Sequence, residues 1–288
     1  MRWLLTGSAG MLGTDVHELL LAEGEEVTAV ARADLDLTDE VAIRAAVAGH
    51  DVVVNCAAWT AVDDAEEHED EAFSVNAVAP ALLARAARGH GARLVHLSTD
   101  YVFDGHAGSP YAETAAMRPA SAYGRTKAAG EWAVRAELPE AHLVLRLAWL
   151  YGAHGACFPT TIVRLARERG GVNVVADQVG QPTWTRDVAS LLLRLVRAGV
   201  PAGTYHATAS GQTSWFEFAR AAVTAAGMPA ETVQPVESAQ FPRPAPRPSY
   251  SVLGHAALEA AGIEPIGPWQ ERWAAAAAEV LEGPARGI

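Results

Sequence analysis

Positive charge is scarce in this sequence and is nowhere concentrated. The 288 residues include 34 acidic and 22 basic side chains, which gives a formal net charge of −12 at pH 7. Without a cluster of lysines or arginines, the chain lacks the electrostatic footprint that binds a nucleic-acid backbone. We therefore expect no nucleic-acid partner. An anionic ligand is still allowed, since a local backbone site can bind one.

Cysteines and long apolar runs are also scarce. The two cysteines, Cys56 and Cys157, form no C-x-x-C pair, and no group of Cys and His has the spacing of a metal site. No apolar run approaches the length of about 18 residues that a membrane span needs. The chain opens directly on an apolar strand and not on a signal peptide. We expect free thiols, no bound metal, no membrane partner and a reducing cytoplasm.

A strand, a glycine-rich turn and a helix open the chain. Trp3 to Thr6 are an apolar run, Gly7, Gly10 and Gly13 follow it, and a helical pattern of apolar residues begins at Met11. Glycine permits a tight turn and a close approach to a pyrophosphate, whose charge the free N–H groups of a helix N-terminus stabilise. The pattern predicts a dinucleotide site, although glycine-rich turns also occur without one.

Strand and helix patterns alternate over the first half of the chain. We expect strands at 26–30, 51–56, 93–97 and 143–147, and helices at 38–47, 71–90 and 121–138. This alternation is typical of an α/β fold with a Rossmann-type doubly wound parallel sheet. We assign residues 1–150 to a dinucleotide-binding domain. Residues 151–288 are assigned mainly to a smaller α/β substrate lobe, with one strand near 203–207 returning to the main sheet.

The second half has a looser pattern. We expect a strand at 172–175 and helices at 158–169, 187–198, 214–226 and 269–281. The stretch 235–248 contains five prolines, so a loop or a polyproline segment is expected there.

The residues after the second strand bear on the choice between NAD and NADP. Arg32 ends this strand, and Asp34 and Asp36 follow it. A basic residue accommodates the 2′-phosphate of NADP, whereas an acidic residue binds the free ribose of NAD. Arg32 favours NADPH. A solvated arginine and the use of NADH remain open alternatives.

Side chains suited to chemistry follow three of the later strands. Ligands of parallel sheets bind at the carboxyl ends of the strands, so these positions are candidate site residues. The small residues Ala57 and Ala58 come after the third strand, and Trp149 comes after the fifth. Hydroxyls and a carboxylate come after the fourth, in the run Leu97–Gly105. Ordinary loops rich in Ser, Thr and Asp are the alternative.

Tyr123 and Lys127 are four residues apart and share one face of a predicted helix. A tyrosine hydroxyl has a pKa of about 10, and a nearby ammonium lowers it. Such a pair can protonate a carbonyl oxygen during hydride addition. The spacing also fits two surface residues, but the glycine turn and the hydroxyl-bearing strand end upstream favour catalysis.

These features together resemble the extended short-chain dehydrogenase/reductase superfamily. Five further motifs narrow the resemblance: N-C-A-A-W-T-A-V-D-D-A-E (55–66), L-S-T-D-Y-V-F-D-G (97–105), R-L-A-W-L-Y-G (146–152), D-Q-V-G-Q-P-T (177–183) and R-P-S-Y-S-V-L (247–253). With these motifs the chain is similar to the dTDP-4-dehydrorhamnose reductase family. With the glycine turn the motifs run from residue 7 to about residue 253, so the resemblance covers nearly the whole chain.

The resemblance implies a catalytic triad of Thr99, Tyr123 and Lys127. Tyr123 would protonate the C4 carbonyl oxygen of a dTDP-4-ketosugar, Thr99 would hydrogen-bond that oxygen, and Lys127 would hold the nicotinamide ribose and keep the pKa of Tyr123 low. With Arg32 and Ser98 included, the expected cofactor contacts are Gly7, Gly10, Met11, Leu12, Arg32, Asp36, Leu37, Ala57, Ala58, Thr60, Asn76, Ser98, Tyr123 and Lys127. The expected substrate contacts are Val62, Thr99, Asp100, Tyr101, Trp149 and Arg247.

The chain departs from the family pattern at two places. Some relatives are dimers bridged by magnesium through glutamates, whereas this chain has Asp15 and Glu18 on its first helix and an aspartate at position 187. We do not carry that metal site over. Ala148 stands where the family commonly has a hydroxyl, which bears on how the sugar sits.

The expected activity is the NADPH-dependent reduction of dTDP-4-dehydrorhamnose to dTDP-L-rhamnose. Two alternatives remain open. One is a related reductase of dTDP-4-ketosugars in antibiotic biosynthesis. The other is a non-catalytic NADP-binding regulatory subunit, since such a subunit of animal methionine adenosyltransferase resembles this family. Both a monomer and a homodimer are compatible with the sequence.

Overall fold

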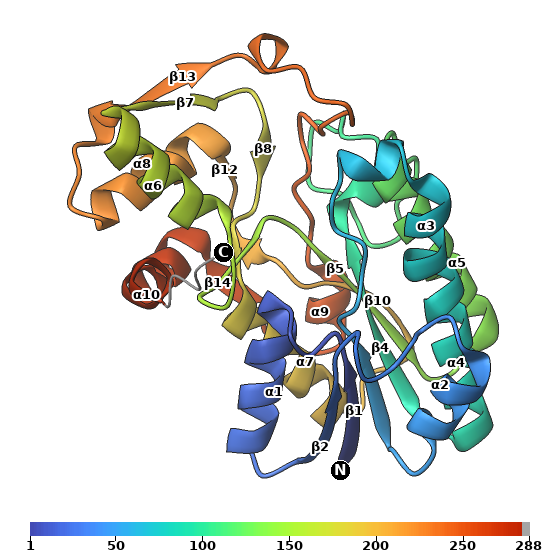
Figure 1. The fold of residues 1–288 in the computed structure, drawn as a ribbon. Coiled ribbons are helices and arrows are strands. Elements are labelled where there is room, and N and C mark those ends of the chain that lie inside the picture. The colour runs from blue at the N-terminus through green and yellow to red at the C-terminus, as the bar shows by residue number, and fades with distance from the viewer. Residues whose placement is uncertain (284–288) are drawn as a thin grey trace.

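A six-stranded parallel sheet forms the centre of the computed structural model, which describes residues 1–283 (Figure 1). Its strand order is β10-β5-β4-β3-β1-β2, and every neighbouring pair is parallel. The strands are β1 (Arg2–Thr6), β2 (Glu26–Val30), β3 (Val52–Asn55), β4 (Arg93–Thr99), β5 (His142–Leu147) and β10 (Gly203–His206). The last five residues of the predicted substrate lobe, 284–288, lie outside the described residues.

Helices cover both faces of this sheet, which confirms the doubly wound fold (Figure 1). The helices α1 (Met11–Ala22) and α7 (Thr185–Arg197) lie together on one face, and α2 (Glu40–Val47), α4 (Ala79–His90) and α5 (Ala122–Glu137) lie on the other. Successive side chains of a strand point to opposite faces. Accordingly, Trp3 and Leu5 join the core beneath α1 and α7, whereas Leu4 joins the core beneath the other three helices.

The helix expected at 71–90 is interrupted. The structure has α3 (Glu69–Phe73), a π-helical turn at Ser74–Val78, and then α4. Pro80 stands in the first turn of α4, and proline has no N–H to continue a regular ladder of hydrogen bonds. π-Turns inside helices often occur at functional sites, and this one contains the predicted cofactor residue Asn76.

A smaller group of elements lies beyond the carboxyl ends of the sheet strands, at the upper left of Figure 1. We call it the small lobe. It consists of α6 (Phe158–Arg169), β7 (Val172–Val175), α8 (Trp215–Ala225) and β13 (Val233–Val236). The strand β13 was not expected, because it contains Pro235. Proline is tolerated here because β13 pairs with β7 alone and is an edge strand. A 3-10 turn, Ser238–Gln240, follows it, so the prediction of a loop or polyproline segment at 235–248 was wrong at its start.

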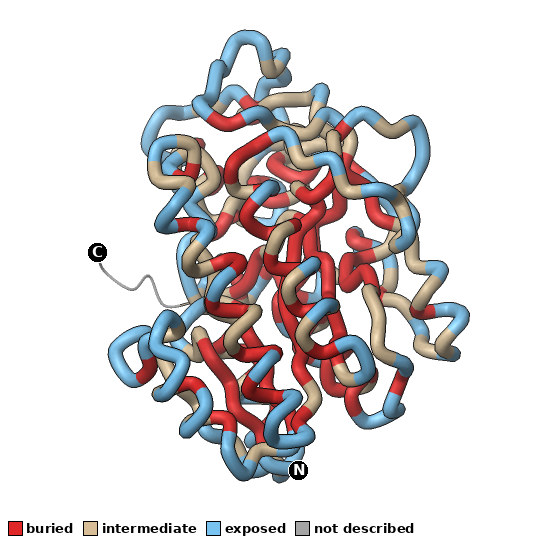
Figure 2. The backbone as a smooth tube through the Cα atoms, turned by 90° about the vertical axis from the view of Figure 1, so that its right-hand side faces the viewer, coloured by how far each residue is buried: buried red, intermediate tan, exposed pale blue. Residues whose placement is uncertain are grey.

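Short elements connect the small lobe to the sheet. They are β6 (Leu150–Tyr151), β8 (Val179–Gly180), β9 (Thr183–Trp184), β11 (Ala209–Ser210), β12 (Thr213–Ser214), α9 (Ala256–Ala260), β14 (Ile266–Pro268) and α10 (Trp269–Glu282). Figure 2 shows buried backbone concentrated in the central strands and exposed backbone in the outer turns. No helix among residues 1–283 has the length and apolar character needed to cross a bilayer.

Candidate active site

A groove of about 750 Å³ opens at the carboxyl ends of β1, β2 and β3. It lies where the strand order reverses, between β1 and β3, which is the usual ligand position in an open α/β sheet. The groove is lined by half of the predicted cofactor residues: Gly7, Gly10, Arg32, Asp36, Leu37, Ala57 and Ala58. The sequence prediction therefore brought together residues from three separate strand ends.

The glycine turn is shaped by close backbone approaches. Gly7 has a φ of +67°, and a Cβ there would lie 2.5 Å from the backbone nitrogen of Ala57. A Cβ on Gly13 would lie 2.2 Å from the carbonyl oxygen of Gly7. The helix α1 begins at Met11, and its N-cap, Gly10, supplies no side-chain hydrogen bond. The N–H groups of Met11 and Leu12 are therefore left for an anion such as the pyrophosphate, while the side chain of Leu12 is in the core.

The acidic residues beside Arg32 are engaged in their own loop. Asp34 accepts a hydrogen bond from the backbone N–H of Ala31 at 2.8 Å. Asp36 accepts from both the N–H and the hydroxyl of Thr38 at 2.8 and 2.7 Å, which lowers its pKa. Arg32 is exposed and lines the groove. This end of the groove therefore suits the 2′-phosphate of NADP better than a free ribose hydroxyl.

Asn76 is buried, and its side chain is fully engaged within the protein. It accepts a hydrogen bond from the N–H of Trp59 at 2.9 Å and donates to the Trp59 carbonyl at 3.1 Å and to the Thr126 hydroxyl at 3.0 Å. Asn76 thus fixes the loop after β3 to the helix α5. In the described part of the chain, Trp59 and Cys56 line the groove, and Thr60 and Val62 do not. Trp59 and Cys56 were not predicted as groove residues, although they lie in the loop and strand end that the sequence pointed to.

Thr99, Tyr123 and Lys127 converge between the end of β4 and the first turns of α5. The Thr99 hydroxyl donates to a carboxylate oxygen of Asp100 at 2.9 Å and accepts from the N–H of Tyr101 at 3.2 Å. The rings of Tyr101 and Tyr123 meet edge to face with centroids 5.6 Å apart. The ammonium of Lys127 donates to the Leu97 carbonyl at 2.6 Å.

Burial controls the protonation of these groups. It raises the pKa of Tyr123 to about 12, against an opposing interaction with the Thr99 side chain. It also lowers the pKa of Lys127 to about 8, against the charge of Glu131. The expected lowering of the Tyr123 pKa by Lys127 is not found, because desolvation dominates and the ammonium is held at the Leu97 carbonyl. Tyr123 is therefore fully protonated at neutral pH, the state that a proton donor requires.

An ion pair behind the triad was missed by the sequence analysis. Glu131 and Arg146 are 0% and 1% exposed and form two hydrogen bonds of 2.9 Å. The Ser98 hydroxyl donates to Glu131 at 2.6 Å, so the side chain of this predicted cofactor residue faces the ion pair. The available signal was the four-residue spacing of Lys127 and Glu131 on one helix. Lys127 is also the only lysine among the 288 residues.

The predicted substrate residues Asp100, Tyr101 and Arg247 lie near Tyr123 of the triad. Asp100 is 3% exposed, and burial raises its pKa to about 6. Arg247 forms an ion pair of 2.9 Å with Asp63 and donates to the Ala245 carbonyl at 3.1 Å. Val62 is half-buried next to Asp63. Arg247 is therefore tied to the loop after β3, close to the predicted substrate residue Val62.

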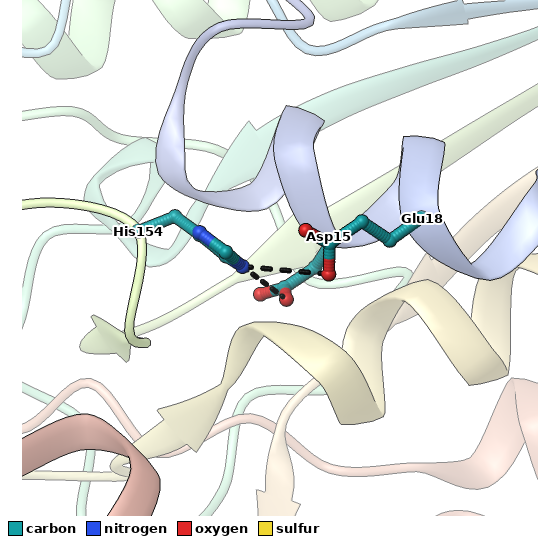
Figure 3. Close-up of side chains that lie close together, drawn as sticks. All are labelled: Asp15, Glu18 and His154. Carbon is teal, nitrogen blue, oxygen red and sulfur yellow. Dashed lines mark ion pairs between the residues drawn. The ribbon is translucent and has the colours of Figure 1, made fainter. Parts of the chain in front are cut away.

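The carboxylates near the first helix do not fit a magnesium site. Within residues 1–283 one group of possible metal ligands occurs, Asp15, Glu18 and His154 (Figure 3). The His154 Nε2 lies 3.5 Å from an oxygen of each carboxylate. The Arg186 guanidinium is also 3.5 Å from Asp15, and Asp187 is bound by an arginine of α10. Magnesium requires octahedral oxygen ligands, whereas these acids face an imidazole and guanidinium groups. We derive no step through a metal.

Comparisons with known proteins agree with the geometry. A family model described as the RmlD substrate binding domain matches residues 1–282. The chain belongs to this family. A dTDP-4-dehydrorhamnose reductase of Streptomyces griseus is 48% identical over 275 residues, which are 93% of this chain and 90% of that protein. These findings confirm the resemblance to dTDP-4-dehydrorhamnose reductases.

Solved structures give the same result. The crystal structure of dTDP-4-dehydrorhamnose reductase from Bacillus anthracis in complex with NADP has a TM-score of 0.93 and 35% identity, covering 96% of this chain and 99% of that one. The crystal structure of a dTDP-4-dehydrorhamnose reductase from Clostridium acetobutylicum has a TM-score of 0.91 and 39% identity, covering 98% of both chains. The fold is therefore that of the dTDP-4-dehydrorhamnose reductases, and the Bacillus anthracis structure was solved with NADP bound.

Proposed function

We propose that this protein reduces the C4 ketone of dTDP-4-dehydrorhamnose to give dTDP-L-rhamnose. The observation that carries this proposal is the position of Tyr123, whose ring packs in one apolar cluster with Trp59 of the groove and whose hydroxyl interacts with the Thr99 side chain. When bound, NADPH supplies the hydride. One hydride added to the carbonyl carbon and one proton added to its oxygen convert the ketone to the alcohol.

Each residue of the triad has a distinct part in this proposal. Tyr123 gives its proton to the C4 oxygen, and the Thr99 hydroxyl orients that oxygen. Lys127 is still mainly charged at pH 7, because its pKa is about 8. Its ammonium can therefore stabilise the phenolate that Tyr123 becomes after the transfer. The carboxylate of Glu131 opposes further loss of that charge.

The other proposed assignments divide the chain into a part that binds the cofactor and a part that binds the substrate. We propose that residues 1–150 hold the cofactor, with Arg32 at the 2′-phosphate, and that residues 151–288 contribute mainly to the substrate. Arg247 would exchange its partner Asp63 for the diphosphate of the sugar nucleotide, since an arginine suits two phosphate oxygens. The free thiols of Cys56 and Cys157 fit a reducing cytoplasm. A monomer and a homodimer remain alternatives.

A second candidate substrate is the ketosugar of a related pathway. A protein of Streptomyces niveus named dTDP-4-keto-6-deoxy-D-glucose reductase is also 48% identical, over 270 residues, covering 93% of both chains. This identity equals that of the Streptomyces griseus relative. Sequence identity therefore does not distinguish the two candidate substrates, and an activity assay with each ketosugar in turn does.

The decisive experiment measures NADPH oxidation with dTDP-4-dehydrorhamnose and identifies the product. Tyr123→Phe should lower kcat by about 10²-fold or more, because a general acid contributes that much, while the Kd of NADPH is unchanged. Tyr205→Phe is the matched control, since the Tyr205 hydroxyl only donates to the Pro201 carbonyl. Full activity of Tyr123→Phe would remove the catalytic assignment. A wild-type protein that binds NADPH but oxidises none with either ketosugar would be a regulatory subunit.

A further inference from the structure

Trp149 has an unusual backbone conformation at the carboxyl end of β5. Its φ is +46°, and it is the only non-glycine residue with a positive φ in the part of the chain that the structure describes. A bulky side chain is disfavoured in this left-handed region and persists there only where its surroundings hold it. The question is therefore what holds Trp149.

One face of the Trp149 indole is covered by Trp215. The two rings are stacked, with centroids 3.6 Å apart and an interplanar angle of 9°. Trp215 is the first residue of α8, whose N-cap is Ser214. It also contacts the ring of Phe158 in α6, with centroids 4.4 Å apart. Trp215 is thus built into the small lobe, whereas Trp149 lies in the bend between β5 and β6.

The other face of the same indole is covered by Gly180. A Cβ on Gly180 would lie 2.4 Å from Cε2 of Trp149 and 2.6 and 2.7 Å from the neighbouring Cζ2 and Nε1. If this Cβ lay in the plane of the indole, outside its edge, it would be closer to Cζ2 and Nε1 than to Cε2. It is closest to Cε2, so Gly180 lies over the face of the ring. Only a residue without a side chain fits there. Gly180 pairs with Thr213, and Val179 pairs with Ser214, through β8 and β12 (Figure 1). The pairing of β8 with β12 therefore holds both Gly180 and the residue before Trp215, so it fixes the groups on the two faces of the Trp149 ring.

We propose that Trp215 is a positioning residue that fixes Trp149 so that Trp149 meets the sugar with its edge and its indole N–H. This inference rests on the proposed function, in which Trp149 contacts the sugar. Both faces of the ring are covered, so stacking on the sugar is blocked in this arrangement. Within residues 1–283, Nε1 of Trp149 has no hydrogen-bond acceptor and is not among the fully buried polar atoms. The donor is therefore available to a sugar hydroxyl.

Four variants test this proposal: Trp215→Ala, Trp215→Phe, Trp149→Phe and the control Trp132→Ala. Trp132 is 62% exposed on α5. Trp215→Ala should raise the KM of the ketosugar about tenfold, the effect of losing one aromatic pair, with the Kd of NADPH unchanged. Trp215→Phe should restore KM, because a phenyl ring still covers the face. Trp149→Phe should raise KM, because it keeps the stack and loses the N–H.

Near-ultraviolet circular dichroism provides a readout that is independent of turnover. The stacked indoles should give a coupled signal that all three variants of Trp149 and Trp215 lose and Trp132→Ala keeps. A wild-type protein without this signal, an unchanged KM in Trp215→Ala, or an unchanged KM in Trp149→Phe would overturn the proposal. Wild-type protein that shows the signal but reduces neither ketosugar would instead refute the proposed function.

Discussion

Gly13→Ala tests whether the glycine turn works through backbone contact. The added Cβ would lie 2.2 Å from the carbonyl oxygen of Gly7, 2.9 Å from Cα of Ser8 and 3.0 Å from the carbonyl carbon of Gly7. All three are backbone atoms, so α1 must move by about 1 Å to reach an ordinary contact distance of about 3.4 Å. Overpacking of this kind costs about 1–3 kcal/mol of folding free energy.

The same movement should weaken the binding of NADPH. It shifts the free N–H groups at the start of α1 away from the pyrophosphate, and a hydrogen bond to a charged group contributes about 1.5–3 kcal/mol. The loss of one such bond corresponds to a rise in Kd of about 10- to 100-fold. Isothermal titration of NADPH measures this change, and thermal unfolding measures the loss of stability.

Gly89→Ala is the matched control for this substitution. Gly89 is in the last turn of α4, and a Cβ there would have no atom within 4 Å. This variant should leave the Kd unchanged and should stabilise the protein by about 0.5–1 kcal/mol, because alanine favours a helix. If Gly13→Ala bound NADPH as tightly as Gly89→Ala does, the close approach of α1 to the turn would have no part in cofactor binding.

Three further predictions concern charged groups. Arg32→Ala should raise the Kd of NADPH about tenfold and leave that of NADH nearly unchanged, and an equal loss for both would remove the argument for the 2′-phosphate. Burial raises the pKa of Asp100 from 3.8 to about 6, so the folded protein binds this proton more tightly than the unfolded chain. The free energy of unfolding of the protein should therefore fall as pH rises from about 4 to about 6, by on the order of 2–3 kcal/mol. Chemical denaturation at several pH values measures this fall, and the Asp100→Asn variant should not show it. Glu131→Gln leaves the buried Arg146 charge uncompensated, which costs about 3–5 kcal/mol and should lower Tm by about 10 °C. The exposed Glu168→Gln should change Tm little by comparison, and equal shifts would refute a special role for the buried pair.

The main elements were predictable because their periodicity is strong. Most strands of the sheet consist of short apolar runs, and two of the helices that cover them begin with a capping side chain. Asp39 and Ser121 cap α2 and α5 through their side chains. The positions of the site residues followed from one rule, that ligands bind at the carboxyl ends of parallel strands. This rule predicts that Gly7, Arg32 and Ala57 lie close together, and all three line one groove.

The features that escaped prediction depend on contacts between distant parts of the chain. The pair β8 and β12 has two residues in each strand, which is too short to show a period. The π-turn at Ser74–Val78 is fixed by Asn76, which bonds residues 17 and 50 positions away. The pKa of Tyr123 depends on how deeply its ring is buried, and a spacing of four residues to Lys127 carries no information about burial.

Composition carries one more signal about the site, and it concerns Lys127. Every other basic side chain that contributes to the count of 22 is an arginine. Arginine keeps its charge at any physiological pH and serves well in ion pairs such as that of Arg146. A lysine is required only where a compact ammonium with an adjustable pKa is needed. Burial lowers the pKa of Lys127 to about 8, and Glu131 limits that fall. The one lysine therefore stands at the buried position to which the proposed mechanism assigns a tunable charge near the proton donor.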